Sequence, residues 1–168
     1  LQWSKNIGGT GSEQASCIIQ TRDGGYAISG STSSFGAGEW DMFIVKIDSG
    51  GTVQWSKTFG GADSDWAYSI VQTADGGYAI AGGIYFFGTA FDMCIVKLDN
   101  NGTLQLSETI GGTGNDVALS VIPTSDGGCA IAGHTTSFGA GLGDMYIAKL
   151  NSVGTIQWNR TIGGTGED

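Results

Sequence analysis

The chain has 168 residues, of which 40% are hydrophobic, only 14% are charged and 31 are glycine. Its formal net charge of −9 repels the phosphates of nucleic acids, and no apolar run approaches the roughly 18 residues that a membrane-spanning helix needs. We therefore expect a globular protein with a substantial core, and neither nucleic acid nor a membrane span among its partners.

Two glycine motifs recur along the chain and divide it into repeats. Gly-Gly pairs begin at positions 8, 60, 111 and 163, and Asp-Gly-Gly triplets begin at 23, 75 and 126, so both motifs return after 51 or 52 residues. A period of this length predicts tandem structural units. The chain then divides into a partial repeat over 1–13, three full repeats over 14–60, 61–111 and 112–163, and the start of another over 164–168.

Each full repeat contains four short runs rich in Val, Ile, Thr and aromatic residues, with turn residues between them. In the first repeat the runs are 15–21, 26–31, 42–47 and 53–57. Such runs predict strands, and Asp-Gly-Gly between the first two predicts a tight hairpin because glycine accepts a positive φ. The sequence therefore predicts an all-β fold of tandem four-stranded antiparallel β-propeller blades, three complete and one partial.

The two ends of the chain fall at the same phase of the repeat. Residues 1–6 match residues 53–58, so we expect the chain to begin in an outer strand and to end just before another first strand. Propellers usually need about four blades or more to close a ring. We expect either a segment of a longer array, or an assembly in which the amino-terminal strand, with Leu1, Trp3 and Ile7, completes the sheet of a second copy.

The recurring markers are clearest in the second repeat. They are Gly60-Gly61, Asp65, Ala67, Ser69-Ile70, Thr73, Asp75-Gly76-Gly77-Tyr78, Ala81-Gly82, Phe87-Gly88, Asp92, Lys97-Leu98-Asp99 and Gly102. Together they resemble the SBBP-type β-propeller repeat family over the whole chain. The resemblance implies a propeller fold and a secreted or cell-surface setting, with no shared catalytic residues. Three positions depart from the pattern: Cys129 replaces a tyrosine, Leu106 a tryptophan and Asn151 an aspartate.

Acidic residues recur at two loop positions that a propeller would place on one face. The candidates for a calcium site with carboxylate ligands are Asp65, Asp92, Asp116 and Asp144. The alternative, which we favour, is that each of them caps a turn by accepting hydrogen bonds from backbone N–H groups. We expect no other cofactor. The repeated lysines at 46, 97 and 149 are interpreted as members of structural ion pairs.

Aromatic residues cluster in the loops between the second and third strands of the repeats. The candidates for contact with a sugar or another subunit are Trp40, Tyr85, Phe86 and Phe91. The alternative is that they cover the edge of a blade. His134 has no counterpart in the other repeats, and the three cysteines are interpreted as small buried hydrophobes, with a disulfide left open.

Three functional hypotheses follow from these patterns. The leading one is a non-enzymatic structural protein of the cell exterior that self-associates into a larger propeller, layer or filament. The second is a glycan- or protein-binding module, with calcium as an option. The third is a quinoprotein-like enzyme, because the glycine–tryptophan spacing resembles that blade motif. Sequons at Asn101 and Asn159 give weak support for a secreted protein.

Overall fold

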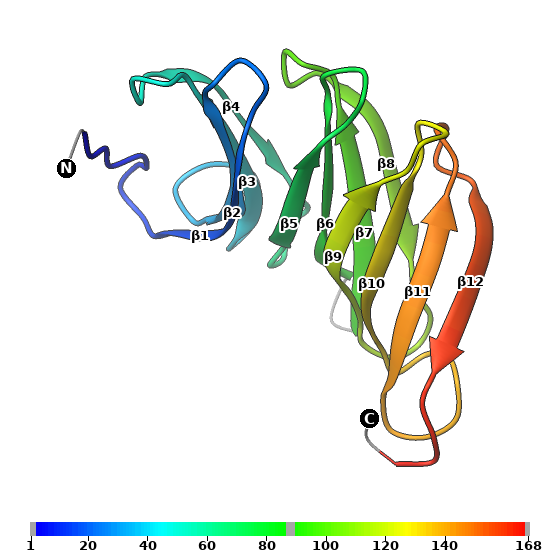
Figure 1. Cartoon of the computed structure of the whole chain (residues 1–168). Coiled ribbons are helices and arrows are strands. Elements are labelled where there is room, and N and C mark those ends of the chain that lie inside the picture. The colour runs from blue at the N-terminus through cyan, green and yellow to red at the C-terminus, as the bar shows by residue number, and fades with distance from the viewer. Residues whose placement is uncertain (1–2, 87–89, 167–168) are drawn as a thin grey trace.

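The computed structural model describes residues 3–86 and 90–166, and for Phe86 it describes the backbone alone. Within these residues the chain forms three four-stranded sheets and no helix (Figure 1). The first sheet contains β1 (Glu13–Gln20), β2 (Tyr26–Thr32), β3 (Asp41–Ile47) and β4 (Val53–Phe59). The second contains β5 (Trp66–Gln72), β6 (Tyr78–Phe86), β7 (Ala90–Leu98) and β8 (Leu104–Ile110). The third contains β9 (Asp116–Pro123), β10 (Cys129–Thr135), β11 (Asp144–Leu150) and β12 (Ile156–Ile162).

Every sheet is an antiparallel meander in which neighbouring strands follow each other in the sequence. The turns between the third and fourth strands carry glycine with a positive φ in each sheet, namely +85° at Gly51, +78° at Gly102 and +85° at Gly154. Residues with a Cβ rarely adopt this conformation, so the glycines fix where each hairpin turns. The meander of four strands is the architecture of a propeller blade, and the all-β prediction is confirmed.

The core lies between the sheets, which stand side by side in Figure 1. One buried cluster joins the first and second sheets and includes Met42, Ile44 and Ile80. Another joins the second and third sheets and includes Ala79, Met93 and Ile131. Because successive side chains of a strand point to opposite faces, Ile80 and Ala79 pack against different neighbours. The middle sheet is therefore buried on both faces, which explains the nearly continuous apolar runs.

The amino-terminal segment differs from the expected outer strand. The described residues before β1 form no strand, and Trp3 and Ile7 instead lie on the outer face of the first sheet. There Ile7 packs against the buried residues Phe43, Val45 and Ile47. A strand needs a neighbour for its backbone hydrogen bonds, and no strand among the described residues pairs with this segment. A fourth, partial sheet is thus not formed by the described part of the chain. No helix in that part could span a membrane.

Candidate functional site

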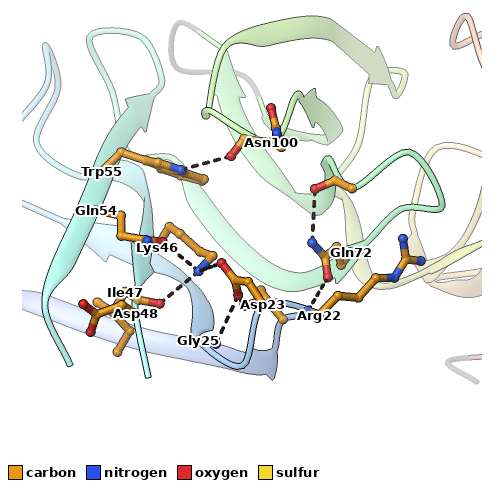
Figure 2. A network of polar contacts seen from close by, with 12 residues as sticks. Arg22, Asp23, Gly25, Lys46, Ile47, Asp48, Gln54, Trp55, Gln72 and Asn100 are labelled. Carbon is orange, nitrogen blue, oxygen red and sulfur yellow. Dashed lines mark hydrogen bonds and ion pairs between the residues drawn. The ribbon is translucent and has the colours of Figure 1, made fainter. Parts of the chain in front are cut away.

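One end of the first sheet holds a network around a buried ammonium group (Figure 2). Nζ of Lys46 donates hydrogen bonds to Oδ2 of Asp23 at 2.9 Å, to Oε1 of Gln54 at 2.8 Å and to the carbonyl of Ile47 at 3.0 Å. Gln54 is the extra residue of a bulge between β3 and β4. All three protons of the ammonium group are therefore used to join β3, β4 and the β1–β2 turn.

The same network recurs in the third sheet and changes in the second. Lys149 donates to Asp126 at 2.7 Å and to Gln157 at 2.9 Å. Lys97 instead donates to the carbonyls of Gly127 at 3.2 Å and Ser152 at 3.5 Å, which belong to turns of the third sheet. The expected structural ion pair is thus present at two of the three repeated lysines, while the other links two sheets.

Further hydrogen bonds join the first two sheets at this end (Figure 2). The backbone N–H of Arg22 donates to Oε1 of Gln72 at 3.0 Å. The guanidinium of Arg22 donates to the carbonyl of Ala74 at 2.9 Å. The indole N–H of Trp55 donates to the carbonyl of Asn100 at 3.3 Å. The junction is therefore fixed by directional contacts as well as by apolar packing.

Carboxylates gather in pairs at the opposite end of the sheets. Asp65 is buried and accepts hydrogen bonds from the backbone N–H groups of Gly61 at 2.6 Å and Tyr85 at 3.1 Å. Asp41, also buried, accepts one from Gly38 at 3.0 Å. Burial raises the pKa of Asp65, and the nearby charges of Asp41 and Asp63 raise it further, against the lowering effect of the two backbone hydrogen bonds. These are the contacts of turn-capping aspartates held close to a like charge.

A second pair lies at the junction of the second and third sheets. Burial, followed by the charge of Asp116, raises the pKa of Asp92. Asp116 accepts hydrogen bonds from the backbone of Gly112 at 2.9 Å and from the hydroxyls of Ser137, at 2.5 Å, and Thr135. Asp144 is buried at the start of β11, and its Oδ1 has no hydrogen-bond partner among the residues that the structure describes.

The candidate calcium ligands therefore do not come together as one set of four. Asp92 and Asp116 are close to each other, whereas Asp65 is paired with Asp41. Among the described residues, no group of three or more His, Cys, Asp or Glu side chains is placed to hold a metal ion. Calcium binding stays a prediction.

The aromatic candidates form two separate pairs. Trp40 stacks on Trp66 of the second sheet, with ring centroids 5.0 Å apart, and Tyr85 meets Phe91 edge-on at 5.0 Å. Beside Tyr85 a cavity of about 320 Å³ opens between the first two sheets. The side chain of Phe86 lies outside the described part of the structure, as does Leu1.

The three cysteines lie in three different sheets, on β1, β7 and β10, and His134 shares β10 with Cys129. All three cysteines are free thiols in the described structure, which joins no two of them by a disulfide. Burial raises the pKa of Cys94 to about 12 and also raises that of Cys129. Both thiols are therefore protonated at neutral pH and behave as core residues. His134 lies half-buried on β10.

A contact that the sequence did not predict as a unit recurs at the sheet junctions. Trp55 on β4 lies over Gly102 in the β7–β8 turn, where a β-carbon would be only 2.9 Å from Cε3 of the indole. The same indole meets the ring of Tyr78 edge-on at 5.5 Å. We call the turn glycine and the tyrosine beside it, here Gly102 and Tyr78, a docking seat, and the tryptophan that lies on them its occupant. At the next junction Leu106 lies against Gly154, and Leu106 and Cys129 line one small cavity of about 10 Å³.

Comparison with known proteins gives a distant structural likeness and no match to a family or a curated sequence. No family model matches the chain, and no curated protein matches its sequence. Among solved structures it is similar to a subtype N11 neuraminidase-like protein of A/flat-faced bat/Peru/033/2010 (H18N11), with 16% identity and a TM-score of 0.48. The match covers 94% of this chain and 42% of that one, so the chain spans less than half of its length. A likeness this distant indicates no function.

The class of the protein follows from its own sheets and junctions. Consecutive four-stranded meanders pack face to face, and the fourth strand of one sheet lies on a turn of the next. This arrangement defines a β-propeller-like repeat protein.

Proposed function

We propose that the chain is a non-catalytic structural repeat protein that self-associates into a larger propeller, layer or filament at the cell exterior. The observation that supports this most directly is the series Met42, Met93 and Met145, which occupy one position in the three repeats. The first two are fully buried between sheets, whereas Met145 is 50% exposed on the outer face of the third sheet.

Other members of the same face repeat this contrast. Trp55 and Phe59 pack against the core between the first two sheets, but their counterparts Trp158 and Ile162 are 47% and 54% exposed. All seven residues of β12 are exposed. The equivalent faces of the first and second sheets are each covered by the next sheet. The exposed apolar face of the third sheet therefore supports association with another sheet of the same kind.

The non-catalytic part of the proposal is supported by how the reactive side chains are used. The buried lysine completes a structural network, Asp65 caps a turn, and the Cys94 thiol is protonated in the core. The location outside the cell is supported by the family resemblance and by the sequon residues Asn101 and Asn159, both of which are exposed.

Sedimentation velocity over a concentration series, with negative-stain images of the same samples, tests this proposal. We expect the average mass to rise with concentration above the 17.2 kDa of one chain, and rings or filaments to be visible. A constant mass of one chain at every concentration would contradict it.

A second candidate function is a glycan- or protein-binding module. It is supported by the cavity of about 320 Å³ in which Tyr85 and Asp65 lie beside apolar residues. Binding to a glycan array, compared between the unchanged chain and Trp40→Ala, with and without a chelator, tests it. Binding that is lost in the variant would favour this function over a purely structural one.

A further inference from the structure

The segment before β1 contacts the first sheet in the same way as β4 contacts the second sheet, through a tryptophan that lies on a turn glycine and a tyrosine. Trp3 lies over Gly51, where a β-carbon would be 3.0 Å from Cε3 of the indole, and it meets Tyr26 edge-on at 6.1 Å. The corresponding values for Trp55 over Gly102 and Tyr78 are 2.9 Å and 5.5 Å. Four residues further on, Ile7 packs on the first sheet as Phe59 packs at the next junction.

The docking seat of the first sheet is therefore complete and occupied from within the same chain. The occupant, Trp3, belongs to a short segment that is not part of a sheet, because no strand of the described structure pairs with residues 3–9. Trp55, in contrast, belongs to a strand that is hydrogen-bonded along its length to β3. The segment that carries Trp3 is thus the weaker of the two attachments.

The third sheet presents a tryptophan of the same kind, and no docking seat lies beneath it within residues 3–86 and 90–166. Trp158 occupies on β12 the position that Trp55 occupies on β4, and it is 47% exposed. The face around it includes Met145, Ile162 and Ile122, which are 50%, 54% and 57% exposed.

We infer that Trp158 of one copy docks on Gly51 and Tyr26 of a second copy, and that Trp3 competes with it for this seat. The inference rests on the proposed self-association and specifies its interface and its internal competitor. At each of the two junctions inside the chain, a sheet of this repeat packs on the next one. A third sheet of a second copy that packs on the first sheet would make one more junction of the same kind, so we take the occupant to be a second copy.

The geometry of the contact fixes the kind of assembly that results. The face of β9–β12 differs from the face of β1–β4, so the contact is head-to-tail and leaves one free face of each kind until the assembly closes. Two copies that close on each other would bring together six sheets, within the usual range of about four to eight propeller blades. Without closure the same contact would build a filament.

Three single variants of the full chain test the inference by sedimentation velocity. Trp158→Ala removes the docking residue and should weaken association about tenfold or more. Trp3→Ala empties the seat and should strengthen association several-fold. Leu104→Ala is the matched control, because Leu104 and its counterparts Val53 and Ile156 are exposed in all three sheets. It should leave association unchanged.

The opposite signs of the two tryptophan variants separate this inference from the proposed function. If the unchanged chain associates and both variants associate equally well, another surface carries the assembly, so the inference fails while the proposed function stands. If the unchanged chain keeps the mass of one copy at every concentration, the proposed function itself fails. Circular dichroism of each variant confirms that the sheets are intact, and an unfolded Trp3→Ala is replaced by Trp3→Leu, which fills the seat less completely.

Discussion

Lys46 and Asp23 form an ion pair of 2.9 Å in which the two partners have very different environments. The lysine side chain is 4% exposed, whereas that of the aspartate is 55% exposed. The charge that depends on the pair is therefore the cation, because only the cation has lost its water. Removing either partner should have unequal consequences.

We predict that Asp23→Ala destabilises the chain more than Lys46→Met does. The first change leaves a buried ammonium group with only Gln54 and a carbonyl, which costs about 1–3 kcal/mol. The second removes the buried charge and leaves the exposed aspartate free to meet water. Urea unfolding of both variants measures the difference. Equal losses would show that the lysine is not effectively buried.

Stability should also pass through a maximum below neutral pH. Asp65 and Asp92 have a raised pKa in the folded chain, so the folded state takes up their protons more readily and gains stability as the pH falls from 7. Asp23 and Asp126 have a lowered pKa, chiefly because Lys46 and Lys149 donate hydrogen bonds to them. Their contribution is present above the ordinary value of 3.8 and is lost as the pH falls below it.

Urea unfolding between pH 7 and pH 3 measures this profile, and Asp65→Asn identifies one of its causes. The variant cannot take up the proton, so its gain in stability on acidification should be smaller than that of the unchanged chain. An unchanged gain in Asp65→Asn would assign the effect to other carboxylates.

The three equivalent methionines give a prediction about burial. Met93 is fully buried, so Met93→Ala should cost about 2–5 kcal/mol through lost apolar contact and the cavity left behind. Met145 is 50% exposed, and Met145→Ala should cost less than about 1 kcal/mol in the single chain. Thermal unfolding at low concentration compares them. A large cost at position 145 under these conditions would mean that its face is already covered.

Much of the fold could be predicted because its signals are local. The turn glycines and the apolar runs placed strands at 42–47 and 53–57, and the structure has them at Asp41–Ile47 and Val53–Phe59. The expected amino-terminal strand is not formed, and the reason is tertiary: residues 3–6 match part of a strand in sequence, but no strand in the described part of the chain pairs with them. A comparison of repeats shows that two segments have similar residues, but it does not show whether each segment has a neighbouring strand to pair with.

The candidate sites were harder to predict because they lie between repeats. Asp41 and Asp65 occupy different positions of the repeat, and the structure pairs them across a junction. The sequence likewise showed Leu106 and Cys129 as two unrelated departures, although Leu106 replaces the docked tryptophan and Cys129 replaces the tyrosine of the docking seat beneath it. Comparing positions across neighbouring repeats, rather than within each repeat, would have shown the link.

That link predicts a coupled pair of substitutions. Leu106→Trp alone would crowd a cavity of about 10 Å³, and Cys129→Tyr alone would face a leucine, so each should destabilise by about 1–3 kcal/mol. Together they rebuild the pair seen in Trp55 and Tyr78, and the double variant should recover at least about 1 kcal/mol relative to the sum of the single losses. A double-mutant cycle in urea measures this coupling, and additive losses would rule it out.

The turn glycines allow the docking seat to be separated from backbone strain. Gly102 and Gly76 have similar φ angles, +78° and +88°, so alanine is strained at both. A β-carbon at Gly102 would also press on Trp55 at 2.9 Å, whereas at Gly76 it would meet nothing within 4 Å. Gly102→Ala should therefore cost about 1 kcal/mol or more beyond Gly76→Ala. In a Trp55→Ala background the difference should vanish, since the strain remains and the indole is gone. A difference that persists there would place the extra cost in the turn and not in the contact between the sheets.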